Sequence, residues 1–398
     1  MGHRHIDCTT GLLAAEASEA GVPASLVDEL IERAHREIRS GLLPSCQLAL
    51  AHNGRLVAYR TLGAAQPDDR FVVFSCTKIL MAGALWLAIG EGLVSRDTRV
   101  AQVVPEFATN GKEVVTVEQL LTHTAGFPSA PFSPDDWEDR ARRLERFSSW
   151  RLNWKPGSRF EYHSAAAHWV LAEILERVTG TDYRRFIHER LTEPLGLSRL
   201  RLGVPEESQS DIQGLVAVGE PPTSEQIESA TGIAGLDLTE LGNVAEEHLL
   251  EFNGVARRRV GVPGGGAVGT AAELAMFLQA VMANPGRMWD PGVLAAGTRE
   301  VLCTFTDPMV GVPANRTLGL LLAGDDGCSA LRGFGRTVSA AAFGHMGAGG
   351  QVAWADPASG LSFVYLTNGL DRDPIRMGRR GSSLSNRAGA VTLEAGTR

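Results

Sequence analysis

The run SCTKILMAGALWLAIG, residues 75–90, is the most informative part of the sequence. Apolar side chains fall on nearly every face of a helix drawn through this run, which predicts a helix that is buried almost all round. Ser75 would stand in its first turn, where unpaired backbone N–H groups and the positive end of the helix dipole favour a developing negative charge. Lys78 follows three residues later, so its amine lies on the same helix face and can reach the Ser75 hydroxyl.

The Ser75–Lys78 pair predicts acyl-transfer chemistry. Burial beside an apolar helix lowers the pKa of a lysine, so the neutral amine becomes available near neutral pH as a base for the serine. The chain has only three lysines, Lys78, Lys112 and Lys155, and its other basic residues are arginines, which cannot accept a proton. A serine that merely caps the helix and a lysine that reaches toward solvent would give the same spacing, so two further segments bear on the interpretation.

The second segment, WKPGSRFEYHS over residues 154–164, leads into a predicted helix over 165–179. Its Pro-Gly pair predicts a turn, and Ser164 is a suitable N-cap for the helix. Tyr162 would then stand just before the helix and project its phenol into a cleft, where nearby cations can shift it toward phenolate for proton transfer. The alternative is a core tyrosine whose hydroxyl is bonded elsewhere.

The third segment is FGHMGAGG, residues 343–350, directly before a predicted strand. Glycine here would let a substrate lie close against the strand edge. The N–H of Ala348 would pair with that of Ser75 as an oxyanion hole, which stabilises a tetrahedral intermediate. His345 would donate a hydrogen bond to the substrate or help to position Tyr162. The alternative is a glycine-rich turn with a purely structural role.

Predicted strands at both ends of the chain, with helices between them, define the fold class. Asn53-Gly54, between two apolar runs, predicts a hairpin over residues 46–60. A second hairpin is predicted over 350–367, and an amphipathic helix over 24–40. The expected architecture is α/β plus α: an antiparallel sheet flanked by helices, built from both termini and interrupted by an all-helical insertion domain.

The same pattern predicts the domain boundaries. Helical spacing at 117–123, 165–179 and 183–191 supports the insertion, whereas residues 201–235 show no clear periodicity and predict an irregular surface segment. The polar C-terminal tail is expected to be frayed or loosely docked. The predicted parts are an N-terminal extension (1–23), a discontinuous α/β domain (24–105 and 255–378), a helical insertion domain (106–254) and the tail (379–398).

In this order and at comparable separations, the three segments resemble the motifs of the serine β-lactamase and penicillin-binding-protein superfamily. The pattern is most similar to the class C β-lactamase branch, which includes the family VIII carboxylesterases, and it spans roughly residues 25–370. The resemblance implies a β-lactamase/transpeptidase-like fold with a cleft between its two parts. No metal or organic cofactor is expected.

The resemblance also implies a role for each site residue. Ser75 would be the nucleophile, and Lys78 and Tyr162 would be the general base and acid. The backbone N–H groups of Ser75 and Ala348 would be the oxyanion donors. Substrate contacts are implied for Ser164, His345 and Gly347.

Two departures from the β-lactamase pattern bear on the activity. Ser164 stands where β-lactamases usually keep an asparagine, and His345 replaces the lysine of Lys-Thr-Gly. Without that lysine, no permanent cation awaits a β-lactam carboxylate. The predicted function is therefore hydrolysis of a carboxylic ester through an acyl-enzyme on Ser75. The alternatives are transfer of the acyl group to an amine or alcohol, β-lactamase or D-amino-acid peptidase activity, and a non-catalytic binding protein.

The rest of the sequence predicts no competing catalytic centre. The chain has no GxSxG pentapeptide, which disfavours a nucleophile-elbow hydrolase. His123, in LLTHTAG, is interpreted as a turn residue rather than as the base of a triad. The walls of the substrate pocket are expected from residues 125–150 and 200–260, and Trp137 and Trp150 are interpreted as packing of the helical insertion.

Composition narrows the partners and the location. With a net charge of −8 and only short basic blocks, the chain shows no basic face for nucleic acid. Five scattered cysteines without a CxxC pattern predict neither a disulfide framework nor a zinc site. No apolar stretch has the length of a signal-peptide core or a membrane helix, so a reduced, cytoplasmic enzyme acting on a small-molecule ester or amide is expected. The oligomeric state is left open.

Overall fold

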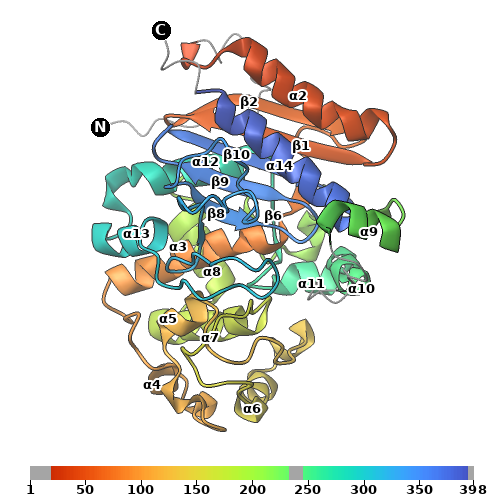
Figure 1. Cartoon of the computed structure of the whole chain (residues 1–398). Coiled ribbons are helices and arrows are strands. Elements are labelled where there is room, and N and C mark those ends of the chain that lie inside the picture. Colours follow the sequence, from red (N-terminus) through yellow and green to blue (C-terminus); the bar gives the residue numbers. More distant parts are fainter. Residues whose placement is uncertain (1–18, 233–244, 393–398) are drawn as a thin grey trace.

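The computed structural model describes residues 19–232 and 245–392, and Figure 1 shows how their helices and strands are arranged. At the centre lies an antiparallel sheet of β1 (Ser45–His52), β2 (Arg55–Gly63), β7 (Leu321–Leu322), β8 (Phe343–Met346), β9 (Val352–Asp356) and β10 (Leu361–Thr367). The strand order is β2-β1-β10-β9-β8-β7. Strand β1 is bonded directly to β10, with Cys46 opposite Thr367. The prediction of one antiparallel sheet built from both termini is therefore confirmed.

Both predicted hairpins are present. The first turns at Asn53-Gly54, whose φ angles of 50° and 78° lie in the left-handed region that a two-residue hairpin turn requires. His52 and Arg55 are therefore opposite each other at its end. The second hairpin joins β9 to β10 through residues 357–360. Both could be predicted because turn chemistry and strand alternation are local properties of the sequence.

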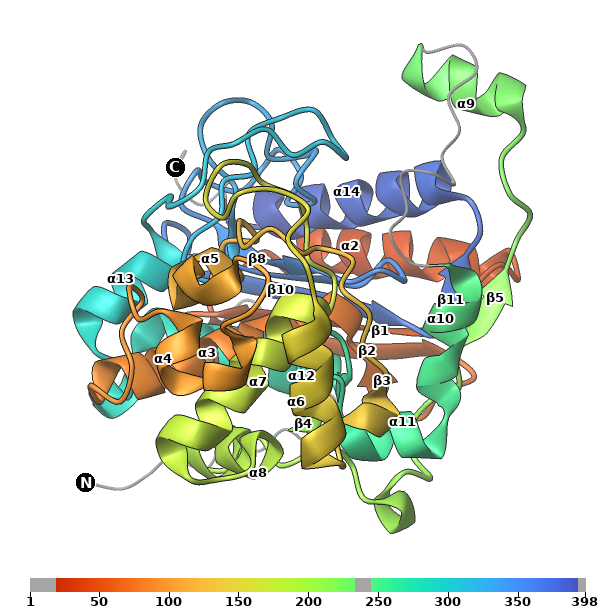
Figure 2. The same cartoon turned by 90° about the horizontal axis from the view of Figure 1, so that it is seen from below.

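Helices cover both faces of the sheet, as the two views in Figures 1 and 2 show. Helices α2 (Ala24–Arg39) and α14 (Pro374–Ala390) contact each other on one face, whereas α12 (Ala271–Ala283) packs against the other. The amphipathic helix predicted over 24–40 corresponds to α2. The sheet is therefore a middle layer between helices, as the predicted fold class requires.

The strands contribute to two hydrophobic cores in alternation. In β1, Leu48 and Leu50 belong to the core formed with α2 and α14. Ala49 and Ala51 point the other way, into the larger core that includes α12 and the helical part of the molecule. Because successive side chains of a strand point to opposite faces, a sheet covered on both sides is apolar on both.

The C-terminal tail differs from its prediction. The sequence predicted a frayed or loosely docked tail from residue 379. This prediction is wrong for residues 379–392, because α14 continues through most of this segment and packs on the sheet. Leu384 and Ala388 are fully buried, and the buried Arg380 donates to Asp371 at 3.1 Å. Gly, Ser and Arg residues make the composition polar, but two apolar residues one helical turn apart are sufficient to dock the helix. Residues 393–398 lie outside the described part.

The helical part is built around α3 (Thr77–Gly90), which is buried nearly all round, as predicted. It packs against α7 (Ala166–Thr179) and α8 (Tyr183–Ile187). The turn before α3 contacts β8, where Cys76 Sγ donates a hydrogen bond to the His345 carbonyl at 3.2 Å. Helix α3 therefore joins the sheet to the helical part, while the predicted domain boundaries stay a prediction.

The segment 201–235 is more regular than predicted. Within its described residues it contains β4 (Arg201–Leu202), β5 (Val216–Val218) and α9 (Ser224–Thr231). Strands of two or three residues are too short to show a period in the sequence, which is why they were not predicted. Strand β4 pairs with β6 (Ala267–Gly269), which also pairs with β3 (Phe71–Val72). Strand β5 pairs with β11 (Gly369–Asp371). Residues 233–235 lie outside the described part.

The remaining α-helices of the described residues are short. They are α4 (Val100–Val103), α5 (Val117–Leu121), α6 (Arg140–Ser149), α10 (Glu246–Leu250), α11 (Val255–Val260) and α13 (Pro291–Thr298). No helix among the described residues is both long enough and apolar enough to cross a membrane. The predicted N-terminal extension, residues 1–23, lies outside the described part up to residue 18.

Candidate active site

Ser75 lies in a single 3-10 turn, Phe74–Cys76, directly before α3. The sequence predicted it in the first turn of the helix itself, so the prediction is displaced by one short turn. Phe74 has a φ of 43°, a left-handed conformation that is uncommon for a bulky residue and costs about 1–3 kcal/mol. Its ring packs edge-on against Phe252, with centroids 5.3 Å apart. Packing around Phe74 therefore holds the turn that carries Ser75.

Lys78 is fully buried, and its amine contacts three oxygen atoms. Nζ donates to the carbonyls of Ser164 at 2.9 Å and Gly264 at 2.6 Å, and it lies 3.2 Å from Ser75 Oγ. Desolvation lowers the pKa of Lys78 from its ordinary value of 10.5. A carbonyl can only accept, so a neutral amine that gives its two N–H groups to the carbonyls keeps its lone pair for the Ser75 hydroxyl. The predicted contact is present, with the amine oriented to act as a base.

Tyr162 approaches the same hydroxyl from the chain segment before α7. Its Oη donates to Ser75 Oγ at 3.0 Å, and Lys78 Nζ lies 5.1 Å from the centre of its ring. Ser75 Oγ is therefore contacted by an amine and a phenol, which come from segments more than eighty residues apart in the chain. The structure brings together all three residues for which the sequence predicted catalytic roles.

A buried histidine lies behind Tyr162. The ring of His123 is 4.7 Å from that of Tyr162, and its Nδ1 accepts the backbone N–H of His163 at 3.1 Å. His123 has a φ of 59°, as suits a residue in a tight turn, and burial lowers its pKa well below the usual range. The interpretation of His123 as a turn residue agrees with this geometry. Its ring also packs against the ring of Tyr162.

Arg316 is a charged neighbour of Tyr162 that sequence analysis missed. It is 4% exposed, and its guanidinium carbon lies 5.2 Å from the centre of the Tyr162 ring. A guanidinium stays protonated in proteins, so a permanent positive charge lies behind the Tyr162 ring. Arg316 does not line the cavity next to Ser75, so the expectation that no cation awaits a substrate carboxylate stays a prediction. No local signal marks this arginine, which stands in an irregular stretch between α13 and β7.

His345 is held by that arginine. Arg316 donates to His345 Nε2 at 3.2 Å, so the other ring nitrogen carries the proton and donates to the Met346 carbonyl at 2.8 Å. Burial and the Arg316 charge lower the pKa of His345 well below its usual range. Because both ring nitrogens are occupied, a hydrogen bond from His345 to substrate is not available in this arrangement. Its ring lies 5.9 Å from that of Tyr162, which favours the other predicted role, positioning.

The loop after β8 places Ala348 beside Ser75 in one cavity. Neither the Ala348 N–H nor the Ser75 N–H is bonded to a backbone carbonyl of the described residues. A Cβ on Gly347 would lie 2.6 Å from Oε1 of Gln351 and 3.0 Å from the Val73 carbonyl, so only glycine fits there. Gln351 Oε1 also accepts the N–H of residue 349 at 2.9 Å, which fixes the loop. Two free N–H groups beside the nucleophile are what an oxyanion hole requires.

Ser164 has a different role from the predicted helix cap. The residue at the N-cap of α7 is Ala165, and no side chain caps the helix. The Ser164 carbonyl instead accepts from Lys78, as described above. The helix begins at Ala166, one residue later than predicted, so Ser164 stands one residue before the N-cap position. The Ser164 side chain lines the cavity next to Ser75, so its predicted substrate contact stays a prediction.

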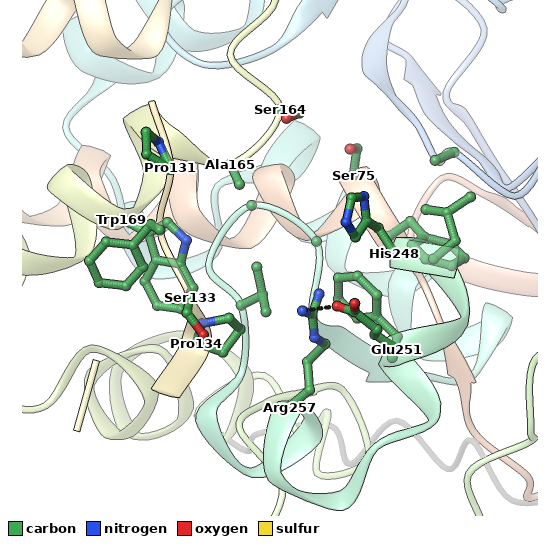
Figure 3. Close-up of a pocket in the computed structure, with 18 of the residues that line it drawn as sticks. Ser75, Pro131, Ser133, Pro134, Ser164, Ala165, Trp169, His248, Glu251 and Arg257 are labelled. Carbon is green, nitrogen blue, oxygen red and sulfur yellow. Dashed lines mark hydrogen bonds and ion pairs between the residues drawn. The ribbon is translucent and has the colours of Figure 1, made fainter. Parts of the chain in front are cut away.

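The cavity that starts at Ser75 has a volume of about 640 Å³ and is drawn in Figure 3. Its walls come from residues 131–146 and 248–265, within or close to the expected ranges, and also from 164–169. Trp137 and Trp150 are buried and do not line it, as the packing interpretation requires. The tryptophan in the wall is Trp169, which was not singled out.

Metal-binding and redox side chains play no visible part in this site. Within the described residues, no group of three or more His, Cys, Asp or Glu side chains could hold a metal ion. The four cysteines that the structure describes are free thiols. Burial raises the pKa of the Cys76 thiol, next to Ser75, to about 12, so this thiol stays protonated.

Comparisons with known proteins agree on the family and the fold. The family model named Beta-lactamase matches residues 25–383. The esterase/beta-lactamase LipL of Mycobacterium tuberculosis is 27% identical over 319 residues, which cover 76% of this chain and 70% of that protein. A penicillin-binding-protein homologue from Caulobacter crescentus has a TM-score of 0.73 at 27% identity, over 92% of this chain and 97% of its own. A family VIII carboxylesterase, 24% identical, shares the fold with a TM-score of 0.73 over 91% and 97%. The predicted β-lactamase/transpeptidase-like fold is confirmed.

Proposed function

The chain belongs to the Beta-lactamase family, and from that premise we propose that it is a serine hydrolase that cleaves a carboxylic ester through an acyl-enzyme on Ser75. One observation carries the proposal: Ser75 Oγ lies 3.2 Å from Nζ of Lys78 and 3.0 Å from Oη of Tyr162. The amine can take the serine proton, and the phenol can give a proton to the leaving group. A hydroxyl that serves only as a helix cap would need neither group.

Acylation begins with the neutral amine of Lys78. The Ser75 Oγ–H proton moves to Nζ while Oγ forms a bond to the ester carbonyl carbon. The carbonyl oxygen becomes an oxyanion, and the N–H groups of Ser75 and Ala348 are its donors in this mechanism. When the intermediate collapses, the carbon–alkoxide bond breaks and the Tyr162 phenol gives its proton to the alkoxide. The products are an alcohol, the acyl-enzyme, a protonated Lys78 and a Tyr162 phenolate.

Deacylation restores every group. The Tyr162 phenolate takes a proton from water, and the resulting hydroxide adds to the acyl carbon. The second tetrahedral intermediate then expels Ser75 Oγ, which recovers its proton from the Lys78 ammonium. The Arg316 guanidinium carbon lies 5.2 Å from the centre of the Tyr162 ring, so a positive charge stands beside this residue in both half-reactions.

An ester fits this site better than a β-lactam. Arg316 donates to His345 and does not line the cavity, so its charge is not presented to a carboxylate on the substrate. Ser164 offers a hydroxyl where an amide side chain would otherwise contact the amide of a β-lactam. The substrates are small-molecule esters or amides, and we propose the ester as the better one. A cytoplasmic location and the absence of a nucleic-acid partner stay predictions.

The test is covalent labelling combined with ester kinetics. A fluorophosphonate probe should label the protein on Ser75, as located by peptide mass spectrometry. Ser75→Ala should lower p-nitrophenyl ester turnover about 10³-fold or more, with an unchanged melting temperature. Ser133→Ala, which removes another hydroxyl from the same cavity, is the matched control and should keep most of the activity. A label on another residue, or full activity in Ser75→Ala, would refute the mechanism.

Two further arms separate the alternative activities. Adding an amine or an alcohol to the ester assay tests acyl transfer, for which a new amide or ester product must be detected. Nitrocefin tests β-lactam hydrolysis in the same preparation. We expect release of free acid to dominate, and nitrocefin turnover comparable with ester turnover would reverse the order of the hydrolytic activities.

A further inference from the structure

The proton donor Tyr162 lies outside the cavity that borders Ser75. The cavity is lined by Ser75, Ser164 and Gly264, whereas Tyr162 is not among its lining residues. In the tetrahedral intermediate the leaving oxygen must be within reach of Tyr162 Oη, because this phenol protonates it. The oxyanion must point to the N–H groups of Ser75 and Ala348. The remaining substituent, the acyl chain, is therefore directed into the cavity.

The body of the cavity is apolar and its rings are held in place. Trp169 and Phe132 are packed together with ring centres 4.6 Å apart, and Phe252 is packed against Phe74. Val262 also lines the cavity. Rings anchored by their neighbours give a preformed surface that loses little side-chain freedom when a ligand binds.

The charged groups at the far end are paired with one another. Arg146 Nε lies 3.0 Å from an oxygen of Asp136, and Arg257 forms an ion pair with Glu251, visible as the dashed line in Figure 3. Each guanidinium that lines the cavity thus has a carboxylate beside it. An anionic acyl group would have to share a guanidinium with the carboxylate already beside it, and a cationic group would have to share a carboxylate, whereas an uncharged group leaves both pairs as they are.

From this arrangement we infer that the enzyme selects esters of bulky, uncharged, apolar acids, with an aromatic acyl chain as the best fit. The inference rests on the proposed function, since it identifies the acyl half of that ester. A volume of about 640 Å³ is far more than an acetyl group fills. Each methylene group buried in such a wall raises kcat/KM about fourfold, so an aromatic acyl chain should exceed acetyl by tenfold or more.

The neck of the cavity offers positions for a direct test. A Cβ on Gly265 would lie 3.5 Å from the Phe252 ring, which is ordinary contact, so a larger side chain there would occupy space over that ring. Ala165 also lines the cavity (Figure 3). Gly264 is unsuitable, because its Cβ would lie 2.8 Å from the Ser164 carbonyl.

The experiment uses the full chain and four esters with one leaving group, p-nitrophenol: acetate, butanoate, 4-phenylbutanoate and the monoester of glutaric acid. We expect kcat/KM for 4-phenylbutanoate to exceed that for acetate at least tenfold, and the charged glutarate to fall below butanoate. Gly265→Leu should lower the ratio of 4-phenylbutanoate to acetate about tenfold. If Gly265→Leu does not fold, Ala165→Leu tests the same ratio at a second lining position. Gly378→Leu, at an exposed position on α14 with open space around it, should leave the ratio unchanged.

The outcomes separate this inference from the function on which it rests. If esters are hydrolysed through Ser75 but acetate or glutarate is preferred, the acyl assignment is wrong and the hydrolase assignment stands. An aromatic preference that survives both wall variants would also overturn the assignment, because the acyl chain would then lie elsewhere. If Ser75 is not labelled and no ester is cleaved, both conclusions fall.

Discussion

Lys78 and Lys112 are two buried lysines with nearly the same surroundings. Each amine donates to two backbone carbonyls and contacts one hydroxyl: the Lys112 bonds reach the Thr109 carbonyl at 2.8 Å, the Trp150 carbonyl at 2.5 Å and Thr109 Oγ1 at 2.9 Å. Desolvation lowers the pKa of both amines, that of Lys112 to about 8. Burial and a lowered pKa therefore do not by themselves make a lysine a catalytic base.

The difference lies in the hydroxyl that each lysine contacts. Thr109 Oγ1 donates its own proton to the Ser148 carbonyl at 2.5 Å, so it can only accept from Lys112. The partners of Ser75 Oγ among the described residues are the Lys78 amine and the Tyr162 phenol, and neither is a carbonyl. Ser75 also borders the cavity, while neither Thr109 nor Lys112 does. Lys78 can therefore take a proton from Ser75, whereas Lys112 only links the turn at Thr109 to the chain segment at Trp150.

The largest expected effect comes from the same substitution at both lysines. Lys78→Arg should lower kcat/KM for a p-nitrophenyl ester about 10³-fold, because a guanidinium keeps the charge but has no lone pair for the Ser75 proton. Lys112→Arg should change it less than about twofold, since Lys112 acts only as a donor. Circular dichroism melts of both variants check that the folded population is the same. Equal losses in the two variants would show that the amine of Lys78 has no special role.

A second effect concerns pH. Since the neutral form of Lys78 is the base, the rate of fluorophosphonate labelling should rise about tenfold per pH unit and level off below pH 10.5, the ordinary lysine value. The Arg316 charge helps to lower the pKa of Lys78, so Arg316→Gln should raise this pKa. The rising part of the pH–rate profile should then move to higher pH. The rate at pH 7 should then fall severalfold.

Arg316→Lys is the matched control for this shift, because it keeps the charge and changes the shape. The pH–rate profile of Arg316→Lys should stay near that of the unchanged enzyme. A profile that does not move in Arg316→Gln would mean that Arg316 acts on packing alone, and a rate that does not rise with pH would remove Lys78 from the role of base.

The smallest effect on turnover is expected at the structural lysine. Lys112→Met leaves the Thr109 and Trp150 carbonyls without their buried donor, which should lower the free energy of unfolding by about 2–3 kcal/mol. Thr109→Val removes the bonds through the hydroxyl and should cost about 1 kcal/mol. Urea unfolding measures both, and turnover per folded molecule should stay unchanged. A loss of turnover in folded Lys112→Met would contradict the contrast between the two lysines.

Local features of the site could be predicted from the sequence. Ser75 and Lys78 are one helical turn apart, and the apolar run that follows predicts a buried helix. The hairpin at Asn53-Gly54 is equally local, since its turn residues and its flanking strands are adjacent in the chain. Tyr162 was singled out because a turn and a helix start place it at a projecting position.

Features that depend on distant partners could not be predicted. Arg316 reaches Tyr162 and His345 only because an irregular segment folds back across the site. The hydrogen bond from Lys78 to the Ser164 carbonyl is equally long-range, and no local pattern predicts it. The docking of α14 was missed because its polar composition concealed the buried Leu384.

The groups that can do chemistry follow from local sequence: a serine and a lysine in helical register, a tyrosine before a helix, and a glycine loop before a strand. Their order and spacing also predict the fold, because helices and hairpins arise from neighbouring residues. That the Ser75 proton is free while that of Thr109 is engaged, and which rings line the cavity, follow from the folded structure alone. Hydrogen-bond direction and cavity shape depend on atoms far apart in the chain, so no local pattern contains them.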